Sequence, residues 1–234
     1  MKGVVLAGGK GTRLFPLTKV TNKHLLPVGK EPMIFHPIRQ MVCAGITEIL
    51  VVTSTDHMGD IVRCLGSGEE FGCEITYRVQ KNAGGIADAL SLSKSFAGHE
   101  KLCVMLGDNI FKEKIIPFVN SFTCQKTGAR VLIKKVDDPS RFGIAALDER
   151  QIIEIEEKPK TPKSPYAVVG LYFFDSKVFD YISEISPSKN GELEITSVNN
   201  KYIEQGELEF DIYEGEWTDA GTFESLHEAN RLLL

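Results

Sequence analysis

The first half of the chain alternates short apolar segments with longer segments in which apolar residues recur every three or four positions. The short segments have the length and composition of buried strands. In the longer segments the recurrence is that of a helix with one buried face, as at Ile34, Ile38, Met41 and Val42. Strands separated by helices predict a mainly parallel sheet with helices on both faces. We expect strands at residues 3–7, 48–53, 74–79 and 102–106, and helices at residues 32–44, 57–66 and 85–96.

The second half of the chain is richer in strands. Residues 159–165 contain three prolines and are expected to form a loop. The sequence shows no internal repeat, low-complexity segment or clear linker, so we expect one domain, residues 1–234, with halves at about 1–125 and 126–234. The expected strands are at residues 129–135, 143–147, 152–156, 168–174 and 208–213, and the expected helices at 176–185, 195–205 and 222–233.

Composition and charge narrow the function classes. A net charge of −5 argues against a large basic face for nucleic acid, although a few local cations and backbone N–H groups suffice to bind phosphate. The five cysteines form no C-x-x-C pair and no zinc-like spacing, and Cys43 and Cys103 lie in apolar runs, so reduced and buried thiols are expected. Because neither a signal peptide nor an apolar stretch of about 18 residues occurs, we expect a cytoplasmic protein without membrane contact.

A glycine-rich segment follows the first predicted strand. Gly8, Gly9 and Gly11 leave the backbone bare, so its N–H groups can approach a phosphate chain, and Arg13 can pair with two phosphate oxygens. Neither the Walker A pattern nor the G-x-G-x-x-G dinucleotide pattern is present. A simple glycine turn is the alternative, but ligands of open α/β sheets bind at the carboxyl ends of strands, which favours a phosphate site.

Three further charged residues are candidates for phosphate and metal chemistry. Lys23 on its own would be taken for a solvated lysine, but together with Arg13 it resembles a clamp for a triphosphate. Asp108 ends a fully apolar strand, where a carboxylate is well placed to hold a hard cation. Asp219 lies in a turn-like context and on its own suggests a helix cap. No Ser/His/Asp arrangement is visible, and none of the scattered histidines is expected to act as a base.

Six short motifs occur in one order along the chain, namely L-A-G-G-K-G-T-R-L, K-H-L-L-P, L-G-D-N, E-E-K-P, G-E-L-E-I-T and W-T-D-A-G-T. Together they resemble the signature of the sugar nucleotidyltransferases. Each motif alone is weak, but the resemblance covers essentially the whole chain and is nearest to members that use dTTP and glucose 1-phosphate. It implies a Rossmann-like, mainly parallel mixed sheet flanked by helices, of the nucleotide-diphospho-sugar transferase type, with a nucleotide-binding first half and a sugar-binding second half.

The resemblance also implies a reaction and roles for individual residues. An oxygen of the sugar phosphate attacks the α-phosphorus of a nucleoside triphosphate and pyrophosphate leaves, so no protein nucleophile is needed. Mg²⁺ is the implied cofactor, held by Asp108 and Asp219, and small-molecule substrates and a homo-oligomer are the implied partners. The implied catalytic residues are Arg13, Lys23, Asp108 and Lys158, the nucleotide-binding residues are Leu6, Gly8, Gly9, Gly11, Thr12, Arg13, Gln80 and Gly85, and the sugar-phosphate-binding residues are Asn109, Gly143, Glu157, Lys158, Val168 and Lys189.

Without the resemblance, several of these residues would be assigned otherwise. Gln80 would be a polar strand end, although its amide suits the edge of a pyrimidine, and Glu157 and Lys158 would be surface charges. Thymine differs from uracil by one methyl group, worth only about 1–3 kcal/mol in a pocket, so we expect dTTP to be preferred with some use of UTP.

The sequence departs from the family pattern at a few positions. Asn190 stands where an arginine is common, so one phosphate contact is expected to weaken or to pass to Lys189. Ser197 and Val169 replace an aspartate and a threonine, and the base-side loop is Ala83-Gly84-Gly85, which bears on the choice of sugar and base. The chain ends without the C-terminal helical extension of longer relatives, so feedback through a second site is not expected.

Three alternatives remain open. The first is a transferase that uses UTP, another nucleotide or another sugar phosphate. The second is a catalytically inactive subunit that binds a nucleotide sugar; retention of Arg13, Lys23, Asp108 and Asp219 argues against it. The third, a Rossmann oxidoreductase, lacks the dinucleotide fingerprint.

Overall fold

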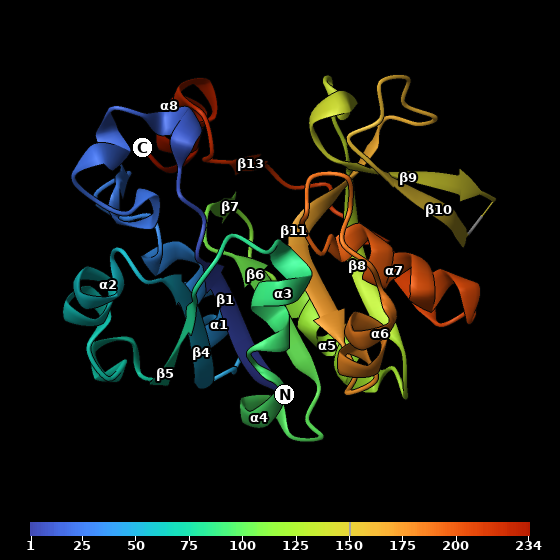
Figure 1. Cartoon of the computed structure of the whole chain (residues 1–234), viewed down its shortest axis with the longest axis horizontal. Helices are drawn as coiled ribbons and strands as arrows, with labels where there is room; N and C mark the ends of the chain where they lie inside the picture. Colours follow the sequence, from blue (N-terminus) through green and yellow to red (C-terminus); the bar gives the residue numbers. More distant parts are fainter. Residues whose placement is uncertain (150) are drawn as a thin grey trace.

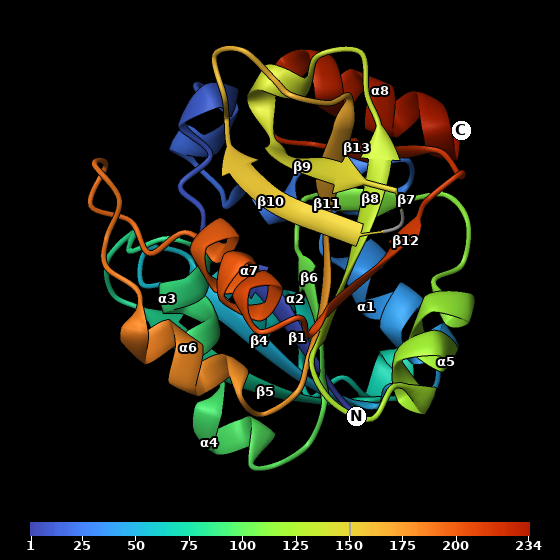
Figure 2. The same ribbon diagram turned by 90° about the vertical axis from the view of Figure 1, so that its right-hand side faces the viewer.

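The computed structural model describes residues 1–149 and 151–234. In this part of the chain nine strands form one sheet with helices on both faces (Figures 1 and 2). The strand order is β10-β9-β11-β6-β1-β4-β5, with β8 paired to β11 and β12 paired to β8. Every strand predicted from the sequence is present, as β1 (Lys2–Ala7), β4 (Glu48–Ser54), β5 (Glu74–Gln80), β6 (Leu102–Leu106), β8 (Ala129–Lys135), β9 (Gly143–Asp148), β10 (Gln151–Glu157), β11 (Tyr166–Phe174) and β12 (Leu208–Ile212).

The N-terminal half contributes the parallel strands β5, β4, β1 and β6. The inner strands β4, β1 and β6 are apolar along most of their length because side chains on both of their faces are buried, whereas the edge strand β5 mixes buried and exposed residues. Val4 of β1 lies in the core on one side of the sheet, and Val5 lies in the core on the other side. The carboxyl ends of parallel strands meet at one edge of a sheet, so the segments after β1, β4, β5 and β6 lie near one another.

Strand β11 joins the two halves of the chain. It pairs antiparallel with β8 along one side and with β6 and, through Ala167, β9 on the other side, and nearly all of its residues are buried. Strand β10 continues the sheet antiparallel to β9, whereas β12 runs parallel to β8. The expected mixed sheet is therefore observed, with its antiparallel pairs in the C-terminal half.

Helices cover both faces of the sheet and one end of the molecule. One core contains side chains of α3, α6 and α7, and the opposite core contains side chains of α1, α2 and α5 (Figure 2). Helix α8 packs on a third, smaller cluster that includes Leu14 and Val28. None of the described helices is long and apolar enough to cross a membrane. The helices are α1 (Phe35–Cys43), α2 (Met58–Leu65), α3 (Ile86–Ser91), α4 (Lys94–Ala97), α5 (Ile116–Cys124), α6 (Val178–Glu184), α7 (Ile195–Glu204) and α8 (Phe223–Leu233).

Three expectations from the sequence need correction. The helix expected at 85–96 is two short helices, α3 and α4, because the N–H groups of Leu92 and Ser93 bond three residues back and the Ser93 hydroxyl donates to the Leu90 carbonyl. The turn expected around Asp219 is instead a short strand, β13 (Trp217–Asp219), which pairs antiparallel with β7 (Asn109–Phe111). Cys43 is exposed, unlike the buried Cys103, because it is the last residue of α1.

Gly128 is a position at which the packing of β8 tolerates no side chain. Its φ is +93°, and a Cβ atom would lie 2.3 Å from the carbonyl oxygen of Glu207. Gly45 has a similar φ of +81°, but a Cβ atom there would have nothing within 4 Å. The two glycines therefore separate backbone strain from steric overlap.

We predict that Gly128→Ala lowers the free energy of unfolding more than Gly45→Ala does. The left-handed backbone costs alanine about 1–2 kcal/mol at either position, and overlap adds about 1–3 kcal/mol at residue 128. Urea denaturation of the two variants and the parent measures the difference. Equal losses for both variants would contradict the steric account.

Candidate active site

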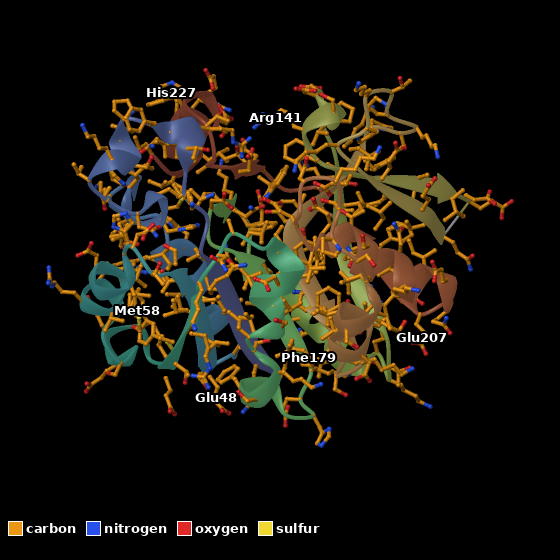
Figure 3. The ribbon with its side chains drawn as sticks, viewed as in Figure 1. Glu48, Met58, Arg141, Phe179, Glu207 and His227 are labelled. Atoms are coloured by element: carbon orange, nitrogen blue, oxygen red, sulfur yellow. The ribbon has the colours of Figure 1, made fainter. Side chains whose placement is uncertain are left out.

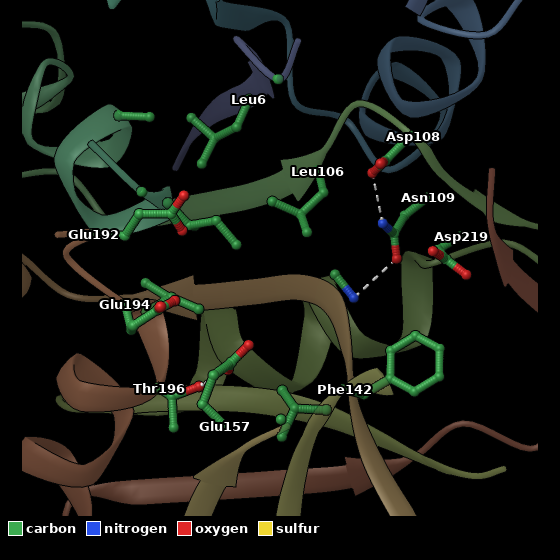
Figure 4. A pocket seen from close by; sticks show the side chains of 18 of the residues that line it. Leu6, Leu106, Asp108, Asn109, Phe142, Glu157, Glu192, Glu194, Thr196 and Asp219 are labelled. Atoms are coloured by element: carbon green, nitrogen blue, oxygen red, sulfur yellow. Dashed lines mark hydrogen bonds between the residues drawn. The ribbon is translucent and has the colours of Figure 1, made fainter. Parts of the chain in front are cut away.

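A cavity of about 510 Å³ opens at the carboxyl ends of β1, β5 and β6, between these strand ends and the C-terminal half (Figure 4). Residues from both halves of the chain form its wall, so segments far apart in sequence are brought together there. Most of the site residues expected from the sequence line this cavity, namely Leu6, Gly8, Gly9, Arg13, Lys23, Gln80, Gly85, Asp108, Asn109, Gly143, Glu157, Lys158, Val168 and Asp219.

Three of the expected site residues are not in the wall. Gly11 and Thr12 lie at the start of a 3-10 turn, Thr12–Leu14, where the Gly11 carbonyl accepts a hydrogen bond from Thr18. Lys189 lies in the exposed segment between α6 and α7. The structure therefore brings the glycine loop to the cavity through Gly8 and Gly9, and it leaves Lys189 outside.

Asp108 is held by a donor at each of its two carboxylate oxygens. The Lys23 ammonium lies 2.5 Å from Oδ2, and the Asn109 amide donates to Oδ1 at 3.0 Å. The Asn109 carbonyl oxygen accepts from the Gly170 backbone N–H at 3.0 Å and from the Trp217 indole at 2.8 Å. Asn109 thereby connects β7, β11 and β13 and fixes the direction of the Asp108 side chain (Figure 4).

The two aspartates expected to hold a metal have opposite electrostatic environments. Burial opposes ionisation of Asp108, but Lys23 and the hydrogen bonds to its oxygens outweigh burial and hold the pKa of that carboxyl well below its usual range. For Asp219, burial and the negative charge of Asp108 raise the pKa, against the opposing effect of Arg141 and Arg13. Two carboxylates that repel each other in this way are typical of a site at which a bound cation would neutralise the negative charge.

No larger set of metal ligands accompanies this pair. Among the described residues, no group of three or more His, Cys, Asp and Glu side chains is arranged to hold a metal ion. The carboxylates of Asp108 and Asp219 both line the cavity; Asp108 immediately precedes β7, and Asp219 lies in β13 and pairs with Asn109 of β7. Two carboxylates completed by substrate phosphates suit Mg²⁺, which seldom has an all-protein set of ligands.

His24 lies beside these charges but remains neutral. Burial, reinforced by Lys23, lowers the pKa of His24 to about 3. Its Nδ1 atom lies 2.7 Å from the side-chain oxygen Oδ1 of Asn22. This oxygen can only accept, so the ring proton is on Nδ1. The uncharged ring packs against Gly107.

Gln80 presents an acceptor because its donors are used within the protein. Its amide nitrogen donates to the Gly85 carbonyl at 3.1 Å and to the Asp88 carboxylate at 2.7 Å. Both partners can only accept, so they fix the orientation of the amide and leave Oε1 as the remaining polar atom. An atom at this position can accept from an N–H group of a ligand.

Gly85 ties the loop beside Gln80 to the opposite wall. Its φ is +97°, and a Cβ atom there would lie 2.5 Å from the Leu193 carbonyl oxygen. The Leu193 N–H donates to Gly84 at 2.7 Å, and the Ala87 N–H donates to Leu193 at 3.0 Å. The flanking Glu192 and Glu194 line the cavity, so backbone hydrogen bonds hold one wall to the other (Figure 4).

Acidic side chains dominate the wall contributed by the C-terminal half. Glu157 accepts from the Thr196 hydroxyl at 2.5 Å and pairs with Lys158 at 2.9 Å. Burial, and the negative charge of Glu157, raise the pKa of Glu194. Lys158 has a φ of +44°, a costly conformation for a residue with a side chain, and its N–H donates to the Phe142 carbonyl.

Several lining residues were not identified from the sequence. Some of them lie within the motifs, so their neighbours in the motif could have indicated them. Arg141 and Phe142 come from a loop that contains no motif. Arg141 pairs with Asp219 at 3.2 Å. The lining residues missed include His24, Arg141, Phe142, Gly170, Tyr172, Glu192, Glu194, Thr196, Asn199 and Trp217.

Comparison of the sequence with known proteins gives concordant results. A family model described as nucleotidyl transferase matches residues 2–234. A glucose-1-phosphate thymidylyltransferase of Neisseria meningitidis is 42% identical over 233 residues, which are 98% of this chain and 81% of that protein. A protein of the same name from Xanthomonas campestris is 42% identical over 232 residues, 97% of this chain and 79% of that protein.

Solved structures share the fold. A Bacillus anthracis protein, provisionally named glucose-1-phosphate thymidylyltransferase and solved with sucrose, is 58% identical with a TM-score of 0.96, and the match covers 100% of this chain and 95% of that one. A UDP-glucose pyrophosphorylase solved with UDP-glucose is 25% identical with a TM-score of 0.85, and the match covers 98% and 97% of the two chains.

We predict that Lys23→Met destabilises the protein in a pH-dependent manner. Removing one partner of a buried ion pair costs about 3–5 kcal/mol, and this loss is expected at pH 7–8. The folded-state pKa of Asp108 lies below its unfolded value, so the pair stabilises the parent above about pH 4, and that stability is lost at lower pH. In the variant, burial raises the pKa of Asp108, so protonation removes the deficit as the pH falls.

Chemical denaturation between pH 4 and pH 8 measures this effect. The double variant Lys23→Met/Asp108→Asn is the control, because it removes both charges and should recover most of the stability at pH 7–8. A deficit that is independent of pH would contradict the prediction.

Proposed function

The chain belongs to the nucleotidyl transferase family, and we propose that it is a glucose-1-phosphate thymidylyltransferase, which forms dTDP-glucose and pyrophosphate from dTTP and glucose 1-phosphate. The observation that carries the proposal is that the glycine loop, Lys23 and Asp108 share one cavity with Glu157 and Lys158. The first group suits a triphosphate and the second suits a sugar phosphate.

On the nucleotide side, the proposed groups stabilise charge and do not react covalently. The N–H groups of Gly8 and Gly9 approach the phosphates, and Arg13 and Lys23 neutralise the charge that grows on the leaving pyrophosphate. An oxygen of the sugar phosphate forms a bond to the α-phosphorus as the bond to pyrophosphate breaks. Catalysis then depends on in-line placement of the two substrates.

Asp108 and Asp219 are the residues that we propose to hold Mg²⁺. Their oxygens are hard ligands, and the raised pKa of Asp219 reflects the repulsion that a cation would relieve. When bound, the ion supplies charge neutralisation at the phosphates. Lys23 and Asn109 keep Asp108 ionised and oriented for this role.

On the sugar side, hydroxyl groups are the proposed ligands of the acidic wall. Glu157 and Glu194 can accept hydrogen bonds from sugar hydroxyls, and Lys158 contributes a positive charge close to Glu157. Asn109, Gly143 and Val168 complete this part of the proposed site. We further propose that both halves act as one catalytic unit in a cytoplasmic homo-oligomer.

Gln80 supports recognition of thymine or uracil. Its free Oε1 accepts from the N3–H group that both bases carry, whereas cytosine presents an acceptor at N3. The same contact does not distinguish thymine from uracil. A UDP-glucose pyrophosphorylase is among the structures that share the fold, so UTP is the second candidate nucleotide.

The proposed function predicts that, with glucose 1-phosphate and Mg²⁺ present, pyrophosphate is released from the nucleoside triphosphate, fastest from dTTP, more slowly from UTP and slowest from CTP. A coupled pyrophosphate assay with each nucleotide measures the order. Asp108→Asn, which keeps the shape of the side chain and removes its charge, should lower kcat by more than about 100-fold. Circular dichroism shows whether that variant keeps its fold. No release with any nucleotide or sugar phosphate would contradict the proposal.

Orientation of the Gln80 amide gives a second prediction. Asp88→Asn provides a side chain that can donate as well as accept, so Gln80 is free to rotate and to present its N–H₂ group to the base. The ratio of kcat/KM for dTTP to that for dCTP should fall by roughly tenfold. Asp60→Asn on the exposed side of α2 is the matched control. An unchanged ratio in Asp88→Asn would contradict the proposed orientation.

A further inference from the structure

Arg141 lies in the cavity wall between Asp219 and the acidic side chains contributed by the C-terminal half. It ends the short 3-10 turn Pro139–Arg141, which precedes β9, and its guanidinium reaches Asp219. The next two residues, Phe142 and Gly143, also line the cavity, and a Cβ atom at Gly143 would lie 3.3 Å from a carboxylate oxygen of Glu157. A phosphate linking the proposed nucleotide and sugar sites would lie in this intermediate position.

The pairing of Arg141 with Asp219 leaves most of the guanidinium unused. One nitrogen, Nη2, lies 3.2 Å and 3.4 Å from the two carboxylate oxygens, and no other hydrogen bond of Arg141 occurs among the described residues. Arginine pairs most strongly when two nitrogens meet two oxygens, so this contact is the weaker and more exchangeable kind. The Arg141 side chain is 35% exposed, and the Phe142 ring lies 5.3 Å from its guanidinium carbon.

The cavity wall contains more negative than positive side chains, so an anionic sugar phosphate needs a cation that still has free donors. The wall carries four positive side chains, Arg13, Lys23, Arg141 and Lys158, and five negative ones, Asp108, Glu157, Glu192, Glu194 and Asp219. A sugar 1-phosphate brings further negative charge into this wall. Lys23 is engaged by Asp108, and Lys158 is engaged by Glu157. Of the two lining cations of the C-terminal half, Arg141 and Lys158, Arg141 has more free donors.

Lys189, the cation that the sequence suggested for this contact, is poorly placed. Lys189 is exposed and does not line the cavity, and Asn190 beside it carries no charge. These two residues occupy the segment to which the sequence assigned a phosphate contact. Arg141 can supply that contact from the opposite side of the cavity wall.

We propose that Arg141 binds the phosphate of the sugar 1-phosphate, and that it exchanges Asp219 for this phosphate when the substrate enters. The proposal rests on the proposed function, because it assumes that a sugar phosphate is a substrate. In the free protein Arg141 neutralises Asp219. In the substrate complex its guanidinium turns to the phosphate, and the oxygens of Asp219 are released.

Arg141→Gln tests the proposal because it should weaken the binding of one substrate, glucose 1-phosphate, and leave the binding of dTTP nearly unchanged. A lost hydrogen bond between charged groups corresponds to a roughly 10- to 100-fold rise in KM for glucose 1-phosphate, while KM for dTTP stays within about twofold. Arg141→Lys keeps the positive charge and loses the forked guanidinium, so its KM for glucose 1-phosphate should lie between those of the parent and of Arg141→Gln. Calorimetric titration with glucose 1-phosphate should show the same loss of affinity without turnover.

A second readout distinguishes binding from a purely structural role. In the absence of substrates, Mn²⁺ binding followed by electron paramagnetic resonance should be as tight or tighter in Arg141→Gln, because the variant lacks the cation that competes for Asp219. If Arg141 only holds Asp219 in place, Mn²⁺ binding weakens and the KM for glucose 1-phosphate does not change selectively. That outcome would overturn the proposal.

Two more variants complete the test. Arg63→Gln removes one positive charge from exposed α2, where the side chain is 85% exposed, and should change none of these values. If Lys189 supplies the contact, Lys189→Gln raises KM for glucose 1-phosphate and Arg141→Gln does not, which also overturns the proposal. Failure of the parent protein to release pyrophosphate would contradict the proposed function, while calorimetry and Mn²⁺ binding still decide the role of Arg141.

Discussion

The side-chain amide of Asn109 is the contact on which the arrangement of the cavity depends. Its nitrogen orients Asp108, and its oxygen accepts hydrogen bonds from Gly170 of β11 and Trp217 of β13. A buried amide satisfied on both sides is costly to disrupt, because each freed partner would lose its hydrogen bond without gaining water. Strands from both halves of the chain are thereby fixed relative to one carboxylate.

Charge in the cavity is balanced by proximity and not by exposure to water. Lys23 and Arg141 occupy the oxygens of the two aspartates in the free protein. Charges that are already in place before the phosphates arrive are the usual basis of catalysis by electrostatic stabilisation, and in our proposal Arg141 alone changes its partner. The neutrality of His24 follows from the same environment, since burial and the nearby ammonium disfavour a further positive charge.

Local sequence was sufficient for the parts of the fold that are decided locally. The apolar runs that became β4 and β6 predicted the parallel sheet, and Gly8 and Asp108, at strand ends, predicted part of the cavity wall, whereas Gln80 was assigned to the site only through the family resemblance. The short strand β13 was missed because its existence depends on pairing with β7, far away in sequence. Arg141 was missed for the same reason, since only the folded chain brings its loop beside Asp219.

The backbone hydrogen bonds between Leu193 and the segment Gly84–Ala87 have a consequence for the evolution of specificity. Because the link uses main-chain atoms, it does not depend on the side chains of Glu192 and Glu194 on either side of Leu193. Substitutions at these two glutamates would change the surface of the proposed sugar site without breaking the connection to the base-side loop. In the proposed function, the acidic wall can therefore vary in sequence while main-chain hydrogen bonds keep it attached to the loop beside Gln80.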